Sequence, residues 1–230
     1  MRTDGRAADE MRKVKATLGF SKFAEGSCLI EVGDTMVLCN ASVEERVPPH
    51  VTSGGWVTAE YSMLPRANRE RSKRDISKLK LSGRSAEIQR LIGRSLRSAT
   101  DLEALGQRTI TIDCDVLQGD GGTRTASVTG GFIALALACR RLMEQGKITQ
   151  MPLRTYVSGI SAGIVRNEAL LDLCYEEDSR AMTAEGDIIE LQATGEGRPF
   201  TPEEQRRLIA LCRKGNAVLT QMQRRCLGEL

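Results

Sequence analysis

An arginine that follows a glycine-rich turn is the strongest candidate for chemistry in this sequence. The segment from Arg108 to Leu117 alternates apolar and polar residues like a strand, and an apolar helix is expected over Thr125 to Arg141. Between them lies Gly119-Asp-Gly-Gly122, followed by Thr123 and Arg124. Glycines let a ligand approach the backbone, and the first N–H groups of a helix attract anions. The turn therefore predicts a phosphate site at Gly122, Thr123 and Arg124.

A second arginine occupies a similar place. Ser82-Gly83 opens an expected helix whose apolar side has helical spacing, at Ile88, Leu91, Ile92 and Leu96. Arg84 stands in its first turn, where a cation is unfavourable unless an anion is close. Arginine can hold a phosphate through two parallel hydrogen bonds. Two helix starts that each have an arginine suggest one shared phosphate.

Other kinds of site fit less well. The glycines also suit a tight turn with no ligand, but their spacing matches neither the phosphate-binding loop of kinases nor the dinucleotide fingerprint. A small-molecule kinase is therefore disfavoured. His50 is the only histidine, which argues against a Ser-His-Asp mechanism and against a histidine metal site.

The elements that would position these arginines read as strands followed by long helices. Strands are expected at Cys28–Val32 and Thr35–Asn40, joined by a tight turn, and at Trp56–Leu64. A second hairpin is expected from Tyr156–Val165 and Ala169–Tyr175, and a further strand at 188–193. Thr201-Pro-Glu-Glu204 begins a helix that should bury Leu208, Leu211, Val218, Leu219 and Met222. This order predicts an α+β fold in a single domain, residues 1–230.

The stretch from Arg66 to Lys80 is the most basic in the chain. Few apolar residues interrupt its charges, so packing should not hold it in place. Such a stretch is usually a solvated loop, but beside a phosphate site it is suited to gripping an RNA backbone. The overall balance is milder, with 33 Lys and Arg against 30 Asp and Glu, so nucleic-acid contact is expected to be a local patch.

Three long motifs resemble ribonuclease PH, a family of bacterial enzymes that use phosphate to trim the 3′ ends of transfer RNA. The motifs are Gly55-Trp-Val-Thr-Ala-Glu-Tyr-Ser-Met-Leu-Pro-Arg-Ala67, Ser82-Gly-Arg with Glu87-Ile-Gln-Arg-Leu-Ile-Gly-Arg94, and Asp113-Cys-Asp-Val-Leu-Gln with Asp120-Gly-Gly-Thr-Arg-Thr125. They occur in the family's order, and the likeness extends from Arg2-Thr-Asp-Gly-Arg6 to the last helix.

The resemblance implies a ribonuclease PH-like fold, similar to the second domain of ribosomal protein S5. It implies phosphorolysis of tRNA precursors and other RNA 3′ ends, with inorganic phosphate as co-substrate, Mg²⁺ as cofactor and a homohexameric ring. It also implies roles for single residues of this sequence: phosphate binding by Arg84, Gly122, Thr123 and Arg124, RNA binding by Arg66, Arg71 and Arg74, and acid catalysis and metal binding by Asp178.

One region departs from the family pattern. The family has a second aspartate six positions after the residue that matches Asp178, and here that position is Ala184. The segment from Ser179 to Asp187 is too short for the strand that normally follows. Glu185 or Asp187 could substitute, although their register differs. A catalytically weak or inactive RNA-binding ring subunit is therefore the alternative function.

Compartment follows from the cysteines and from hydropathy. Seven cysteines are scattered without a Cys-x-x-Cys pair, and most lie among apolar residues, as expected of reduced core residues in the cytoplasm. We expect no signal peptide and no membrane span, because no long apolar run is free of charge.

Overall fold

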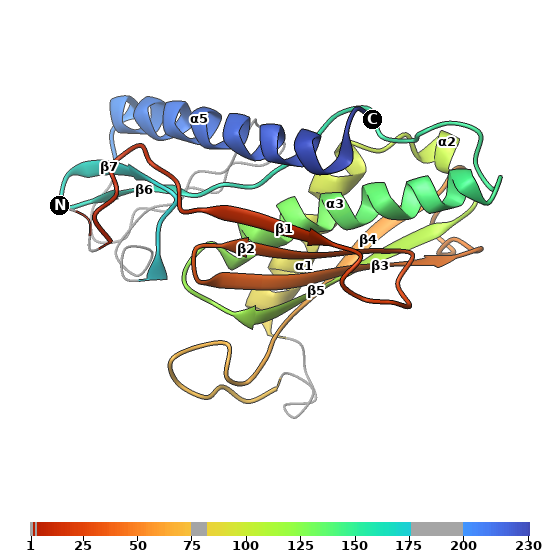
Figure 1. Cartoon of the computed structure of the whole chain (residues 1–230), viewed down its shortest axis with the longest axis horizontal. Helices are drawn as coiled ribbons and strands as arrows, with labels where there is room; N and C mark the ends of the chain where they lie inside the picture. Colours follow the sequence, from red (N-terminus) through yellow and green to blue (C-terminus); the bar gives the residue numbers. More distant parts are fainter. Residues whose placement is uncertain (1, 3, 75–81, 176–199) are drawn as a thin grey trace.

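A five-stranded sheet in the order β1-β2-β3-β5-β4 lies at the centre of the molecule (Figure 1). The computed structural model describes residues 2, 4–74, 82–175 and 200–230. The strands of the sheet are β1 Val14–Leu18, β2 Gly26–Val32, β3 Thr35–Glu44, β4 Trp56–Met63 and β5 Thr109–Gln118. The helices are α1 Gly83–Ser98, the short α2 Leu102–Leu105, α3 Thr123–Glu144 and α5 Pro202–Leu227. A separate hairpin consists of β6 Ala162–Val165 and β7 Glu168–Leu171.

The sheet is mixed. β1, β2, β3 and β5 pair antiparallel, whereas β4 pairs parallel to β5. The connection from β4 to β5 runs through α1, so the fold contains one βαβ unit where only strand runs and helices were expected. This unit places the start of α1 and the end of β5 on the same side of the molecule, because parallel strands end at the same edge. The predicted α+β class is confirmed.

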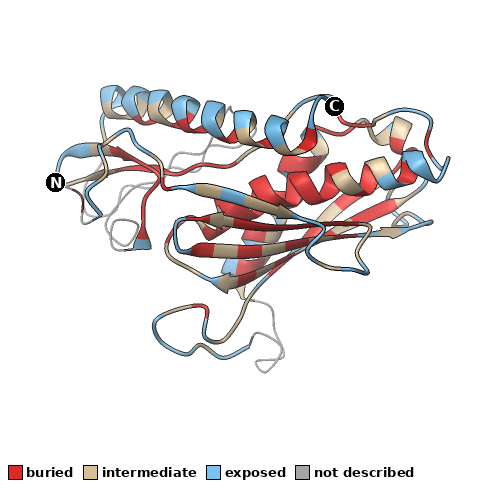
Figure 2. Cartoon of the chain, viewed as in Figure 1, coloured by how far each residue is buried: buried red, intermediate tan, exposed pale blue. Residues whose placement is uncertain are grey.

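The predicted alternation of β5 is also confirmed. Ile110, Ile112 and Cys114 are buried under the helices, while Asp113 and Asp115 lie on the other face. α3 packs against β2, β3 and β5, and most of its residues are buried (Figure 2). Close approach requires glycine here, because a Cβ on Gly26 would lie 1.9 Å from the carbonyl oxygen of Ala134. α3 is long and apolar enough to cross a membrane, but it is the core helix of this sheet.

The β6–β7 hairpin and α5 pack against each other, and α5 also contacts α3 and β1. Arg166 and Asn167 adopt positive φ at the hairpin turn, as the favoured two-residue turns require. The predicted capping box of α5 is present: Thr201 accepts from the N–H of Glu204, whose side chain accepts from the N–H of Thr201. Between hairpin and helix lies a small core of Ile160, Ala162, Leu171, Leu208, Cys212 and Leu219.

The sequence reasoning erred at some element boundaries. Residues 156–161 are not a strand, because the chain there crosses α3 and Gly159 pairs with the Thr129 hydroxyl instead of with a neighbouring strand. β1 was not expected, although Val14, Ala16 and Leu18 alternate with the polar residues Lys15 and Thr17. Val218 was expected in the core of α5 and is 46% exposed. The expected strand at 188–193 lies outside the described residues.

Candidate functional site

A cleft of about 770 Å³ opens where β5, α1 and α3 meet. It is lined by the predicted phosphate-binding residues together with part of the basic stretch and the chain that follows β7. The lining residues are Met63, Asn68, Arg69, Glu70, Arg71, Ser72, Arg84, Gly119, Gly121, Gly122, Thr123, Arg124, Thr125, Ser161 and Tyr175. The structure thus brings together Arg84, Gly122, Thr123 and Arg124 from two separate helix starts.

The glycine turn presents bare backbone to this cleft. Gly121 and Gly122 both have positive φ, at 77° and 66°, which favours glycine. A Cβ on Gly121 would lie 2.5 Å from the carbonyl oxygen of Leu173, so the turn lies directly against the chain after β7. Gly122 is the N-cap of α3, and no side chain caps this helix. The helix start can therefore offer its N–H groups and its positive dipole end to an anion.

Thr123 forms a hydrogen bond with a buried tyrosine. The hydroxyl groups of Tyr61 on β4 and Thr123 lie 2.8 Å apart. Burial raises the pKa of Tyr61, and the hydrogen bond with Thr123 and the charges of Arg84 and Arg124 partly oppose that rise. Both arginines are thus close enough to act on the same hydroxyl.

The start of α1 differs from that of α3. Ser82 caps α1 by accepting a hydrogen bond of 3.0 Å from the N–H of Ser85. There is no acidic residue in the first turn, and the Arg84 side chain is exposed at the cleft. The anionic partner that an arginine needs in this position is therefore not supplied by the first turn of α1 itself.

A buried ion pair, which the sequence did not reveal, supports the glycine turn. Arg12 precedes β1, and its guanidinium lies 2.7 Å from one carboxylate oxygen of Asp172 and 3.0 Å from the other. The same guanidinium donates to the carbonyl oxygens of Asp120 and Gly121. Burial acts to raise the pKa of Asp172, but hydrogen bonds and charge from Arg12 and Arg6 outweigh it and lower that pKa. Arg12 therefore ties the turn to the end of β7.

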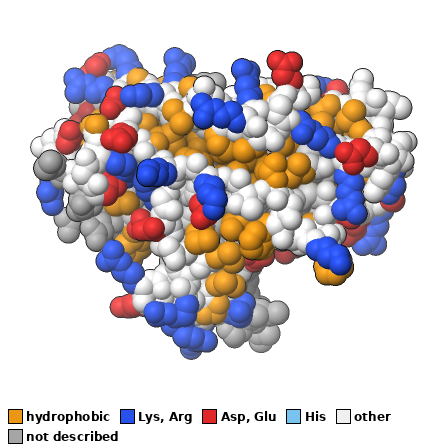
Figure 3. Space-filling view, viewed as in Figure 1, with side chains coloured by type: hydrophobic (Ala, Val, Ile, Leu, Met, Phe, Trp, Pro, Cys, Tyr) orange, Lys and Arg blue, Asp and Glu red, His pale blue; other side chains and the backbone are white. Residues whose placement is uncertain are grey.

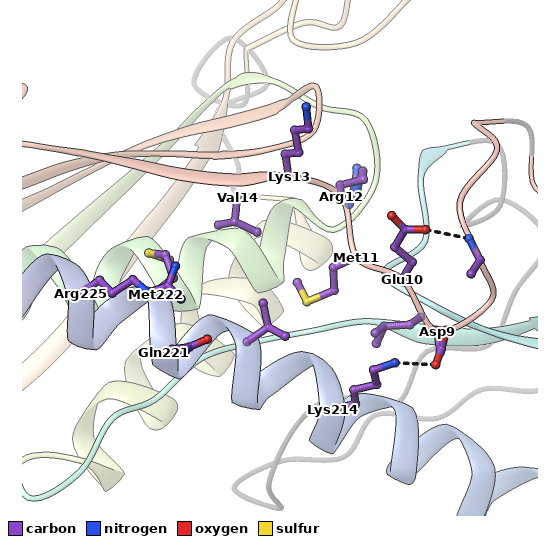
Figure 4. Close-up of a pocket in the computed structure, with 13 residues that line it drawn as sticks. Asp9, Glu10, Met11, Arg12, Lys13, Val14, Lys214, Gln221, Met222 and Arg225 are labelled. Atoms are coloured by element: carbon purple, nitrogen blue, oxygen red, sulfur yellow. Dashed lines mark hydrogen bonds and ion pairs between the residues drawn. The ribbon is translucent and has the colours of Figure 1, made fainter.

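Arg12 also lines a second cleft, on the side of the N-terminal segment and α5 (Figure 4). Its apolar lining includes Met11, Val14 and Met222, and an ion pair from Lys214 to Asp9 joins its two walls. This cleft contains none of the predicted site residues. We therefore assign the candidate site to the first cleft.

The predicted RNA-binding arginines lie on a segment that projects below the sheet, where basic side chains gather (Figure 3). Only Arg71 of the three lines the cleft. Arg66 donates to the carbonyl oxygen of Arg69, at 3.0 Å, within its own loop. Arg74 is close to Asp115, whose pKa is raised by burial and lowered in part by the arginine charge. The three side chains are therefore placed differently relative to the cleft.

The predicted catalytic and metal-binding residue, Asp178, lies outside the described residues, as do Ala184, Glu185 and Asp187. Within residues 2, 4–74, 82–175 and 200–230, no three His, Cys, Asp or Glu side chains are grouped to hold a metal ion. Glu70 is the one carboxylate in the described lining of the cleft. Carboxylate and other oxygen ligands are what Mg²⁺ requires.

Four contributors were missed by sequence reasoning: Tyr61, Arg69, Tyr175 and the pair of Arg12 with Asp172. Tyr61 had a signal, because it stands in the buried register of a predicted strand and has a polar tip that needs a partner. Arg12 had none. It is one of several arginines in a polar segment, and its partner is 160 residues away.

Comparisons with known proteins bear on the family and on the fold. The 3′ exoribonuclease family, domain 1 (RNase PH), matches residues 10–140. The rice (Oryza sativa) protein Rrp46 is similar in structure, with a TM-score of 0.77 and 17% identity over 98% of this chain and 100% of that chain. An Archaeoglobus fulgidus exosome with RNA bound to the active site has a TM-score of 0.78 and 23% identity, over 96% of this chain and 92% of that chain. An archaeal exosome core has a TM-score of 0.72 and 23% identity, over 99% of this chain and 91% of that chain.

The structural likenesses show the fold, and the family match covers more than half of the chain, including β5, the glycine turn and most of α3. This chain therefore belongs to the RNase PH family of 3′ exoribonucleases.

Proposed function

We propose that this chain binds inorganic phosphate in the cleft and uses it to shorten RNA from the 3′ end. The observation that carries the proposal is the convergence of two arginine-bearing helix starts on one cleft, around the uncapped start of α3. Arg84 and Arg124 would hold phosphate oxygens, together with the N–H groups that follow Gly122 and the hydroxyl of Thr123. Family membership supports a 3′ exoribonuclease reaction.

In the reaction, an oxygen of inorganic phosphate attacks the phosphorus of the last phosphodiester. The bond from that phosphorus to the 3′ oxygen of the preceding nucleotide breaks, and this oxygen takes up a proton. The products are a nucleoside diphosphate and an RNA one nucleotide shorter. The task of the protein is to align the two phosphates and offset their charge. The arginines and the helix start supply both at the attacking end.

The leaving oxygen needs a proton donor or a metal ion. We assign this role to Asp178, three residues after Tyr175, with Mg²⁺ as cofactor. When bound, Mg²⁺ would offset the charge that develops on the leaving oxygen. Magnesium retains much of its water and commonly uses one or two carboxylates with substrate phosphates. Asp178 alone would therefore supply the minimum number of protein carboxylates for this ion.

The preferred RNA is a transfer RNA precursor, a choice that rests on the resemblance to ribonuclease PH. An exosome with RNA bound to its active site is among the similar structures, which supports RNA as the class of substrate. We place the protein in the cytoplasm, consistent with seven cysteines that are all free thiols.

Ala184 favours a second candidate, an RNA-binding subunit with little or no turnover. Without a carboxylate at this position, Asp178 lacks its expected partner in holding metal. Loss of a general acid or a metal ligand lowers turnover by about 10²–10⁴-fold and leaves binding nearly unchanged. We expect this chain to bind phosphate and RNA normally and to turn over slowly.

The deciding experiment incubates the full chain with a short RNA, phosphate and magnesium, and quantifies nucleoside diphosphates by chromatography. Release at a rate of order 1 s⁻¹, in the range of working enzymes, means that another carboxylate has replaced the missing one. Alanine variants of Glu185 and Asp187 then identify it. Binding without release supports the second candidate. A chain that binds neither phosphate nor RNA contradicts both.

A variant that restores the missing feature provides the matched control. Insertion of an aspartate-containing strand between Thr183 and Asp187 should raise turnover, whereas an insertion of equal length without the aspartate should not. Exchange of Ala184 alone is a weaker test, because the lost strand also directs the side chain.

A further inference from the structure

Phosphate binding accounts for only part of the cleft. Arg84, Thr123 and Arg124 account for one part of its lining, while residues 68–72 and Tyr175 form another. Cavities of about 300–1,000 Å³ are typical of organic ligands the size of a drug or cofactor. The volume of about 770 Å³ is in that range and exceeds what one inorganic phosphate requires.

Tyr175 is the one aromatic side chain in the described lining of this cleft. Its backbone is anchored, because Leu173 and Cys174 are buried and its own N–H group donates to the Asp120 carboxylate at 3.4 Å. The residue as a whole, in contrast, is 48% exposed. An aromatic ring on an anchored backbone keeps its position in the cleft and still offers a flat apolar surface to a ligand.

Arg69 adds a second planar group. Its guanidinium carbon lies 5.6 Å from the centre of the Tyr175 ring, within the range of a cation–π contact. Its backbone is held by the hydrogen bond that Arg66 donates to its carbonyl oxygen. Guanidinium groups and aromatic rings are the two protein surfaces on which unpaired nucleobases stack.

The cleft therefore combines an anion site with a stacking site. A nucleotide has the matching combination of a charged phosphate and a planar base. Stacking does not require a particular base, because every base has a π-face. A site of this kind suits an enzyme that must accept whichever nucleotide stands at the end of the RNA.

We propose that Tyr175, with Arg69 beside it, binds the nucleobase of the 3′-terminal nucleotide of RNA by stacking. The terminal base is the one concerned, because Tyr175 lines the same cleft as the residues assigned to the attacking phosphate. The inference rests on the proposed function for the identity of the ligand as RNA. It adds a base subsite that no part of the phosphate chemistry requires.

The test compares two short RNAs of identical length, one with a normal 3′-terminal base and one with an abasic 3′-terminal ribose. Their dissociation constants are measured without magnesium for the wild type, Tyr175→Phe and Tyr175→Ala. The wild type and the phenylalanine variant should bind the abasic RNA roughly tenfold more weakly, since stacking of one base has that order of effect. The alanine variant should bind both RNAs about equally.

Retention of the tenfold difference by Tyr175→Ala would overturn the proposal. A wild type that binds both RNAs equally would also overturn it while leaving the proposed function intact. A wild type that binds neither RNA would contradict the proposed function itself. The phosphate dissociation constant should be unchanged in both tyrosine variants, and a shift in the alanine variant comparable to its RNA effect would show a general distortion instead.

A measurement on the unmodified protein protects the test against a poorly folding variant. An RNA with fluorescent 2-aminopurine as its 3′-terminal base should be quenched on binding, whereas the same probe at the 5′ end should not. Equal behaviour of the two probes would contradict the proposal. Arg69→Gln should weaken the 3′ quenching while the Tyr175 ring remains.

Discussion

Arg84 and Arg124 occupy positions that a helix disfavours for a cation and that a bound anion would make favourable. Each stands in the first turn, near the positive end of its helix dipole. Neither first turn contains an acidic residue. A bound phosphate would remove this unfavourable arrangement, so the arginines should contribute more to ligand binding than to folding.

Replacement of Arg84 or Arg124 with Ala should therefore sharply raise the phosphate concentration needed for RNA trimming. Loss of one bidentate, charge-assisted contact costs about 2–4 kcal/mol in the transition state. Initial rates at varied phosphate would measure the effect, or phosphate titration if turnover is too slow. Arg90→Ala is the matched control, since Arg90 is exposed on α1 and does not line the cleft. Unchanged phosphate dependence in both test variants would show that the clamp is misassigned.

Among the supporting elements, the chain that follows β7 and the N-terminal segment meet behind the glycine turn. Asp172 is buried with a positive φ of 52°, and it accepts from the backbone N–H of Arg12 at 2.8 Å as well as from its side chain. The Ser161 hydroxyl stabilises the same region by accepting a hydrogen bond of 3.2 Å from the N–H of Leu173. The turn is thus held by two segments that lie 160 residues apart in the sequence.

Asp172→Asn should destabilise the protein at pH 7 by about 3–5 kcal/mol, because it leaves the Arg12 charge buried without its partner. Since the folded pKa of Asp172 is lowered, its stabilisation is present above the unfolded pKa of about 3.9 and is lost as pH falls through the lower folded value. The difference from wild type in denaturant unfolding should therefore shrink below about pH 4.

Asp9→Asn controls for the change in chemistry, because it removes the exposed ion pair with Lys214 and should have little effect. A deficit in Asp172→Asn that is the same at pH 7 and pH 3 would mean that the lost interaction is not ionic.

The basic segment lends itself to a comparison of its arginines. Arg71→Ala should weaken binding of both a short oligonucleotide and transfer RNA, because Arg71 lines the cleft. Arg74→Ala should weaken only transfer RNA, because Arg74 is not among the residues that line the cleft. Each lost phosphate contact should reduce the slope of log affinity against log salt by about 0.7–0.9. Fluorescence anisotropy at several salt concentrations would measure both. Equal losses on the two RNAs for Arg74→Ala would point to a role in folding or assembly.

Sequence reasoning succeeded where a feature is encoded locally. Neighbouring residues determine both the alternation of Ile110, Ile112 and Cys114 and the capping box at Thr201. Periodicity and spacing in the sequence were therefore enough to predict these two features. A candidate phosphate site could be proposed from the sequence because its glycines and arginines are adjacent to helix starts. The support from Arg12 could not be, because nothing near residue 12 indicates that its charge is neutralised by Asp172. Tyr175 was likewise invisible, since exposure at a cleft depends on which distant segments form that cleft.

The whole molecule has exposed apolar surface that a partner could cover. Phe20 and Phe23, in the loop between β1 and β2, are 52% and 85% exposed. Exposed apolar groups that cluster are typical of contact surfaces. The resemblance of the sequence to ribonuclease PH implies a ring of six subunits.

We predict a homohexamer. Light scattering coupled to size-exclusion chromatography should give six times the chain mass of 25.2 kDa at micromolar concentration. Exchange of Phe23 for Ser should leave the unfolding midpoint of the isolated chain nearly unchanged, because so exposed a side chain contributes little to folding. A monomer across the micromolar range would reject the hexamer.

The bond between Arg12 and Asp172 also has a consequence for the order in which the protein is made. The turn at Gly119–Gly122 and the helix after it are synthesised long before residue 172 leaves the ribosome. Contacts between residues so far apart in the chain form late, since the intervening loop must first be closed. Until then Arg12 lacks the carboxylate of Asp172, and the glycine turn lacks its anchor. During synthesis, the sheet core can therefore assemble as soon as β5 and α3 are available, while the cleft becomes competent to bind phosphate only after the β6–β7 hairpin has docked.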